Sequence, residues 1–296
     1  MRLGFHVPIA GGLSHCLHEA RLRRCQTLQI FTSAPVQWAL RPFDTAEAAA
    51  FVEGLRHADM APLFIHAPYL LNLASPDRLL RRRSTARLVS DLRLANQWGA
   101  AGVVLHLGSG GESSRPASAL KRVAASLREA LDRAGPPALA ILENCAGQGN
   151  IVGATPEELG EVVALCGSDR LGLCLDTAHA FAAGFAIHQP EGLDDLLSRL
   201  AAACGDLLRL VHANDSLAGL GSNRDRHWHI GRGAIGPLGW RTIMSSPRLR
   251  HLPFIMETPK GPRTALQDDL RNLRALRRAI PADCRPPLPP APKACV

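Results

Sequence analysis

The chain has 296 residues and a net charge of +8, with 46% hydrophobic and 20% charged residues. This composition is typical of a globular protein with a large core and excludes a disordered chain. The N-terminus, MRLGFHVPIAGGL, has no apolar segment behind a basic start, so a secretory signal is not expected. No apolar run approaches the roughly 18 residues that a membrane helix needs. We therefore expect a protein of the cytoplasm or nucleoid.

Eight short apolar runs recur along the chain and predict strands. They are residues 2–7, 27–32, 62–67, 102–107, 138–144, 171–176, 207–215 and 253–258. Their starts lie 25 to 46 residues apart, which leaves room for a helix and two loops each time. Apolar residues at three- and four-residue spacing predict helices over 46–58, 118–134, 155–166 and 193–204. Thr155 is expected to cap the third of these, with Pro156 in its first turn.

This alternation predicts an α/β protein folded as a single (β/α)8 TIM barrel over residues 1–280. The last 16 residues, PADCRPPLPPAPKACV, contain six prolines and cannot continue the barrel. We expect residues 281–296 to form a disordered, Pro-rich tail.

Eight cysteines are scattered along the chain without a CxxC pair. Several lie in apolar runs, so they read as small core residues kept reduced, and a zinc site made of cysteines is not expected. Of the 34 basic residues, 31 are arginines. A basic surface suits a polyanion such as nucleic acid, but arginines spread evenly over the surface would give the same composition. The helical segment 78–98 alone holds six arginines, and phosphate contacts or a solvated helix face both remain open for it.

Chemistry in a (β/α)8 barrel is placed at the carboxyl ends of its strands. Six consecutive predicted strands end in a residue able to bind metal: His66, His106, Glu143, Asp176, His212 and Glu257. His179, Asp225 and His227 follow shortly after strand ends. Any one of them alone is better explained as a core or capping residue, but carboxylates converging at one place repel each other unless cations neutralise them.

Nitrogen and oxygen ligands of this kind favour zinc, manganese or iron over calcium or magnesium. Nine ligands exceed what one tetrahedral ion uses, so two or three ions and a bridging carboxylate are expected. Clustered divalent ions favour in-line displacement at phosphorus, because they generate hydroxide near neutral pH and stabilise the attacking and leaving oxygens.

At these residues the sequence resembles the endonuclease IV family of apurinic/apyrimidinic (AP) endonucleases. The resemblance spans roughly residues 2–265 and rests on HVPIAGGL, HAPYLLNLAS, HLGS, ENCAGQGN, LCLDTAHAFAAG, HANDS, RDRHWHIGRGAIG and METPKG. It implies about three Zn²⁺ per chain, with Mn²⁺ or Fe²⁺ as substitutes. One zinc would bind His66, His106 and Glu143; a second would share Glu143 and add Asp176, His212 and Glu257; a third would bind His179, Asp225 and His227.

The resemblance also implies the reaction. A zinc-dependent monomer would hydrolyse the phosphodiester 5′ to an abasic site in duplex DNA, leaving a 3′-hydroxyl and a 5′-deoxyribose phosphate, in base excision repair. It would also clear blocked 3′ ends. Glu143 and Glu257 are the expected catalytic residues, with Glu257 orienting the nucleophile as well as binding metal. No ligand role is assigned to His229, which either supports the metal ligands or is structural, or to His6, which either hydrogen-bonds a ligand or the substrate or is structural.

Family members enter DNA with side chains that fill the gap at the abasic site. The expected DNA-binding residues are Tyr69, Val36 and Gln37. In the segment SAPVQW, Val36 stands where better-known members of the family have an arginine. Loss of that cation is expected to weaken the grip on DNA or the discrimination of damaged sites.

Two other functions compete with this one. A sugar isomerase or epimerase of the same barrel type would need only a single-metal site like Glu143, Asp176, His212 and Glu257. It would leave the remaining five candidate ligands without a task. A catalytically weak protein that binds damaged DNA is suggested only by Val36.

Overall fold

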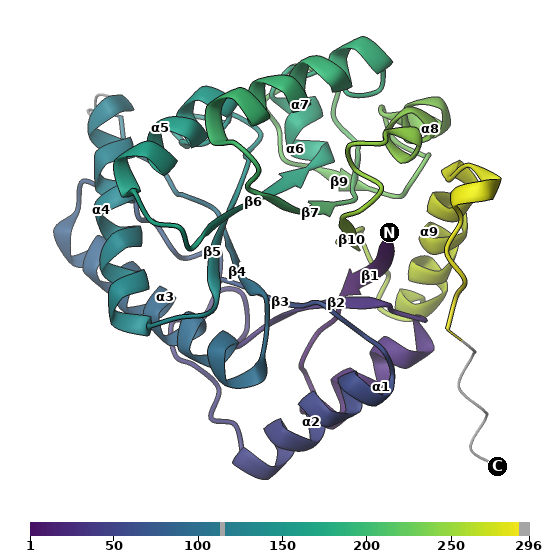
Figure 1. Ribbon diagram of the computed structural model, residues 1–296, viewed down its shortest axis with the longest axis horizontal. Coiled ribbons are helices and arrows are strands. Elements are labelled where there is room, and N and C mark those ends of the chain that lie inside the picture. The colour runs from purple at the N-terminus through teal and green to yellow at the C-terminus, as the bar shows by residue number, and fades with distance from the viewer. Residues whose placement is uncertain (113–115, 290–296) are drawn as a thin grey trace.

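The computed structural model describes residues 1–112 and 116–289. Its centre is a closed barrel of eight parallel strands surrounded by helices, in the order β1-β10-β7-β6-β5-β4-β3-β2 (Figure 1). The strands are β1 (Arg2–His6), β2 (Thr27–Phe31), β3 (Leu63–His66), β4 (Gly102–Leu105), β5 (Leu139–Glu143), β6 (Leu171–Asp176), β7 (Leu208–His212) and β10 (Pro253–Met256). Each lies within one of the eight predicted runs, and the TIM barrel is confirmed.

The helices follow the predicted alternation. They are α1 (Leu13–Leu22), α2 (Thr45–His57), α3 (Arg78–Trp98), α4 (Pro116–Ala134), α5 (Pro156–Cys166), α6 (Thr177–Ala182), α7 (Pro190–Cys204), α8 (Gly236–Ser245) and α9 (Ala265–Ala279). The hydroxyl of Thr155 caps α5 by accepting from the Glu158 N–H at 3.2 Å, and Pro156 stands in its first turn. Both features agree with the prediction, because these residue types satisfy or tolerate the free N–H groups of a first turn.

Two further strands lie outside the barrel. β8 (Asp215–Ser216) and β9 (His227–Trp228) pair antiparallel in a short ribbon. The buried carboxylate of Asp215 holds the segment that follows β9 by accepting from the Gly231 and Ile235 N–H groups and from the Trp240 indole. The ribbon therefore fixes the long loop after β7 to the barrel.

Side chains fill the barrel axis in layers. One buried layer below the carboxyl ends of the strands consists of Phe64, Val104, Ile141, Cys174, Leu210 and Ile255. Where β1 and β2 meet, a Cβ on Gly4 would lie 1.9 Å from the Thr27 carbonyl oxygen, so only glycine allows this close approach. The second, larger cluster of buried residues lies between the strands and the helices.

The chain continues past α9 along the amino-terminal end of the barrel. A short 3-10 helix, η1 (Ala282–Cys284), is followed by carbonyls of Pro286, Pro287 and Pro289 that accept hydrogen bonds from Arg277, Gln26 and Arg24. Residues 281–289 of the expected tail are thus ordered against the barrel, and residues 290–296 lie outside the described residues. The boundary at 280 stays a prediction.

Seven cysteines fall within the described residues; all are free thiols, and six are buried. This agrees with the expectation of reduced core residues. Among the described helices, none has the length and apolarity to cross a membrane.

Candidate metal centre

The six residues expected at the strand ends all point toward the barrel axis. Each stands two positions after a member of the buried layer: His66 follows Phe64, for example, and Glu143 follows Ile141. Because side chains alternate along a strand, residues two apart share a face. The layer therefore forms a floor, and the candidate ligands form the next layer above it, at the mouth of the barrel.

Glu143 occupies the middle of this group. Its Oε2 lies 3.2 Å from His66 Nε2 and 3.4 Å from His106 Nε2. Its Oε1 lies 3.0 Å from His212 Nδ1 and 3.4 Å from His179 Nδ1. One carboxylate thus contacts imidazoles on both of its sides, which is the position that a carboxylate bridging two ions occupies.

The remaining expected ligands complete two further groups. His212 Nδ1 lies 3.3 Å from Glu257 Oε2 and 4.0 Å from Asp176 Oδ2. On the other side, the Asp225 carboxylate lies 3.2 Å from His179 Nε2 and 3.4 Å from His227 Nε2. The sequence-predicted set of nine is therefore brought together around one centre.

Three groups of potential ligand atoms lie within 4.8 Å of one another along these lines. They are His66, His106 and Glu143; Glu143, Asp176, His212 and Glu257; and Asp176, His179 and His227. The first two are the expected sets, whereas the third contains Asp176 where Asp225 was expected. A fourth group adds Cys174 to Glu143 and His212, although a zinc site made of cysteines was not expected. Burial raises the pKa of Cys174 to about 12, so its sulfur is held as a neutral thiol in the floor of the site.

Local structure explains the pair Asp176 and His179. Asp176 ends β6 and caps the short helix α6, where its Oδ1 accepts from the His179 N–H at 2.8 Å. The three-residue spacing places the His179 ring one turn away, and its Nδ1 lies 2.9 Å from the Asn144 carbonyl oxygen. With Nδ1 engaged in this way, Nε2 faces Asp225 and His227.

The charges of the centre are strongly coupled. Burial by itself would raise the pKa of Glu143, but the imidazoles of His212 and His106 hold that pKa well below its usual value. Burial would lower the pKa of His179, but Asp176, Asp225 and Glu143 hold it well above its usual value. The carboxylates thus require compensating positive charge, and divalent cations can supply it in place of protons on the histidines. This donor set of imidazole nitrogens and carboxylate oxygens fits zinc.

Sequence reasoning missed several polar residues that hold these side chains. Asn214 Nδ2 donates to Asp176 Oδ2 at 2.7 Å, and its Oδ1 accepts from the Glu257 N–H at 2.9 Å. Gln29 of β2 reaches both Glu257 and His212. Two features of the sequence could have indicated these residues. One is the glutamine inside the apolar run TLQIF, and the other is the asparagine two positions after His212 in the HAND motif.

His6 and His229, to which no ligand role was assigned, differ in their relation to these groups. His6 Nδ1 lies 3.0 Å from Glu257 Oε1, and burial lowers its pKa to about 4. His229 Nδ1 contacts Asn272 Nδ2 at 3.2 Å. His6 therefore supports a candidate ligand, whereas His229 faces α9.

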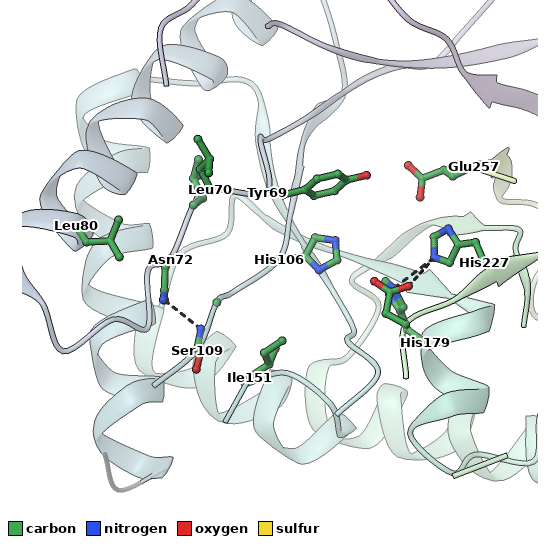
Figure 2. Close-up of a pocket in the computed structure, with 13 residues that line it drawn as sticks. Tyr69, Leu70, Asn72, Leu80, His106, Ser109, Ile151, His179, His227 and Glu257 are labelled. Atoms are coloured by element: carbon green, nitrogen blue, oxygen red, sulfur yellow. Dashed lines mark hydrogen bonds and ion pairs between the residues drawn. The ribbon is translucent and has the colours of Figure 1, made fainter. Parts of the chain in front are cut away.

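A cavity of about 650 Å³ opens over the centre. Figure 2 shows His106, His179 and His227 on one side and Leu70, Leu80 and Ile151 on the other, with Tyr69 reaching across toward Glu257. The Tyr69 ring packs edge-on against His66 and His106, yet the residue remains 58% exposed. Tyr69 thus forms part of the rim rather than of the core.

The segment carrying Val36 and Gln37 lies next to Tyr69, because the Tyr69 N–H donates to the Pro35 carbonyl at 3.0 Å. Val36 is 70% exposed. The guanidinium of Arg87 holds the segment by donating to the carbonyls of Gln37 and Trp38. This arginine of α3 is buried, so it lies neither on a solvated face nor within reach of phosphates.

A family model described as a xylose isomerase-like TIM barrel matches residues 25–276. A probable endonuclease 4 from Oleidesulfovibrio alaskensis is 40% identical over 280 residues, covering 93% of this chain and 94% of the relative. One from Methanosphaerula palustris is 37% identical over 287 residues, covering 95% and 99%. The chain belongs to the endonuclease IV family.

A solved structure agrees with this assignment. The crystal structure of endonuclease IV from Thermus thermophilus is 38% identical, covers 94% of this chain and 98% of that one, and superposes with a TM-score of 0.83. Together with the endonuclease 4 relatives, this likeness makes the chain an enzyme, a hydrolase that cleaves DNA.

Proposed function

We propose that this chain is a zinc-dependent AP endonuclease acting in base excision repair. It hydrolyses the phosphodiester 5′ to an abasic site in duplex DNA and also clears blocked 3′ ends. The observation that carries the proposal is that His66, His106, His179, Asp225 and His227 surround the tetrad Glu143, Asp176, His212 and Glu257. A single-metal isomerase site would give those five residues no task.

The proposed ligand sets are those that the family resemblance implies. His66, His106 and Glu143 would hold one ion, Glu143 with Asp176, His212 and Glu257 a second, and His179, Asp225 and His227 a third. Bound zinc supplies Lewis-acid chemistry, which withdraws charge from phosphate oxygens and lets water ionise near neutral pH. Manganese or iron would fit the same donors.

The protein's own side chains position the reaction. Glu257 lines the cavity, and its Oε1 is held by Gln29 and His6, so its orientation toward the attacking water is fixed before substrate arrives. Attack at phosphorus breaks the bond to the 3′-oxygen of the preceding nucleotide, which leaves a 3′-hydroxyl and a 5′-deoxyribose phosphate. Glu143 lies between the imidazoles of His66 and His212 and would hold these two ligands at fixed positions.

Duplex DNA is the proposed partner, bound by a monomer in the cytoplasm and on the nucleoid. Tyr69 lines the cavity, and the exposed residues Val36 and Gln37 adjoin it through the hydrogen bond from the Tyr69 N–H to the Pro35 carbonyl, which supports contact of all three with the DNA around the lesion. An apolar side chain such as Val36 can fill the space of a missing base by packing against the flanking bases, without adding a phosphate contact.

The direct test is cleavage of a duplex with one tetrahydrofuran abasic analogue, with zinc measured on the same protein. An identical undamaged duplex is the control. Incision 5′ to the analogue and about three zinc ions per chain, with loss of incision and of one zinc ion in His179→Ala, would support the proposal. Protein carrying one ion and cutting neither duplex would overturn it in favour of a sugar isomerase. Full zinc content with tight binding and no incision would favour a protein that only binds damage.

A further inference from the structure

A buried amide lies beside the candidate ligands, at the level of the layer beneath them. Gln29 lies on β2, and the strand register pairs it with His6 of β1 on one side and with Phe64 of β3 on the other. Phe64 belongs to the layer that fills the barrel axis, so the Gln29 side chain points into the barrel as well. The residue is fully buried and has no carboxylate or imidazole with which to bind an ion directly.

Both ends of this amide are engaged by the metal centre. Its Oε1 lies 2.9 Å from His212 Nε2, and its Nε2 lies 2.7 Å from Glu257 Oε1. The same Nε2 lies 3.0 Å from His6 Nδ1. One side chain thus links two candidate ligands that belong to different strands.

The chemistry of the contacts fixes which way the amide points. A carboxylate only accepts hydrogen bonds, so the NH₂ of Gln29 must face Glu257 and its oxygen must face His212. An amide oxygen only accepts, and therefore His212 must carry its proton on Nε2. In the neutral ring, the form that binds a metal ion, the lone pair of His212 is then on Nδ1, the atom that faces Glu143 and Glu257.

The same amide restricts Glu257. Its Oε1 is occupied by Gln29 and by His6, which lies 3.0 Å away. The other oxygen, Oε2, faces His212 Nδ1 at 3.3 Å and is directed into the centre. Glu257 is thereby oriented so that Oε2 is the oxygen available to a metal ion.

We propose that Gln29 is a positioning residue of the metal centre: it sets the tautomer of His212 and the orientation of Glu257, and so tightens one metal site. This inference rests on the proposed metal-dependent function. Partners of this kind orient ligands elsewhere, and their loss typically costs about 10- to 100-fold in metal affinity.

The test compares zinc binding by the full-length wild-type protein, Gln29→Met and Gln26→Met. Methionine is close to glutamine in length and removes both hydrogen bonds. Gln26 is a matched control because its amide bonds the Leu3 N–H and the Pro287 carbonyl at the opposite end of the barrel. Each holoprotein is equilibrated with increasing concentrations of a zinc chelator, and retained zinc per chain is measured along with the melting temperature of the metal-free form.

Gln29→Met is expected to lose one ion at a chelator concentration about 10- to 100-fold below that required by wild type. Gln26→Met should retain zinc as wild type does. Equal zinc retention by Gln29→Met and wild type would overturn the proposal, and so would equal losses in both variants, which indicate general loosening of the barrel. If Gln29→Met does not fold, Gln29→Asn takes its place, because it keeps an amide but is one methylene too short to reach both partners.

This measurement is independent of DNA cleavage. A wild-type protein that binds zinc but does not cut abasic DNA would contradict the proposed function while leaving the role of Gln29 open to the same comparison. A wild-type protein that binds no divalent ion would overturn both.

Discussion

The guanidinium of Arg87 and the carboxylate of Asp91 form an ion pair one turn apart on α3, with 3.0 Å between Arg87 Nε and Asp91 Oδ2, and both side chains are buried. The remaining nitrogens of Arg87 donate to the hydroxyls of Thr32 and Ser33 and to the carbonyls of Gln37 and Trp38. The pair therefore ties the helix to the segment that presents Val36 at the rim of the cavity.

Arg87→Met should lower both stability and DNA affinity. Removing one partner of a buried ion pair leaves the other charge uncompensated and costs about 3–5 kcal/mol of unfolding free energy. The released segment 32–38 should also weaken binding to abasic duplex, while hydrolysis of a small activated phosphodiester by the folded fraction is retained. The unfolding free energy is measured by denaturant titration, and the affinity by binding to abasic duplex. Hydrolysis of the small phosphodiester and cleavage of the abasic duplex are measured on the same protein.

Arg83→Met is the control on the same helix. Arg83 is exposed, and its guanidinium lies 4.4 Å from the centre of the Trp38 ring. Loss of such an exposed cation–π contact costs about 0.5–1 kcal/mol. Equal destabilisation by the two substitutions would contradict the anchoring role of Arg87.

Val36→Arg should strengthen binding to abasic duplex. The new cation would stand at an exposed position on the rim next to Tyr69 and could neutralise one more phosphate. We expect the plot of log affinity against log salt concentration to steepen by about 0.9. Val36→Leu is the control for side-chain size, and an unchanged salt slope in Val36→Arg would show that this position does not reach the backbone.

His227→Ala and His229→Ala should differ sharply although the residues are two positions apart. His227 Nε2 lies 3.5 Å from Asp176 Oδ2 and 3.4 Å from Asp225 Oδ1, whereas His229 contacts Asn272. We expect His227→Ala to lose one metal ion and to lower kcat at least 10-fold. His229→Ala should keep its full metal content, as measured by elemental analysis. Loss of metal from both variants would count against this distinction.

Zinc should stabilise the fold, because the buried carboxylates of Glu143 and Asp176 and the half-buried one of Glu257 are drawn together only in the native state. A ligand that binds the native state alone adds about 2.7 kcal/mol at a free concentration 100-fold above its Kd. Calorimetry should therefore show a melting temperature several degrees lower after chelation, restored by zinc but not by magnesium. Equal melting temperatures with and without the ion would exclude a preformed zinc site.

Stability should fall as the pH rises above 9, because core thiols resist ionisation. Burial raises the pKa of Cys16 and Cys25 from 9.0 to about 12 and that of Cys204 to about 11. Above pH 9 the unfolded chain releases these protons while the native protein retains them, so each thiol lowers the unfolding free energy by about 1.4 kcal/mol per pH unit until its native pKa is reached. Cys25→Ala should reduce the slope of unfolding free energy against pH by about 1.4 kcal/mol per pH unit between pH 9 and 12, the contribution of one proton. An unchanged slope would contradict the assignment.

Much of the fold follows from local patterns in the sequence. The eight apolar runs contain all eight barrel strands, and the arginine-rich segment 78–98 coincides with α3. Six of the nine candidate ligands could also be placed, since each of these six ends an apolar run whose alternation decides which face it shares. Strand and helix periodicities act over a few residues, and a single sequence displays them directly.

Three features depended on tertiary structure. The first is the burial of Arg87, which distinguishes it from the other arginines of α3. The second is the set of hydrogen bonds that Arg24 and Arg277 donate to residues 281–289. The place of Gln29 beside Glu257 depends on barrel closure, which brings together residues 228 positions apart.

The sequence by itself determined the order of the elements, the barrel class and the residue types at the strand ends, because these depend on side-chain alternation and local backbone preference. The tertiary structure decided which of those side chains meet, which polar residues hold them and which charges are buried. Contacts such as that between His6 and Glu257, 251 positions apart, arise only when the first strand pairs with the last and closes the barrel.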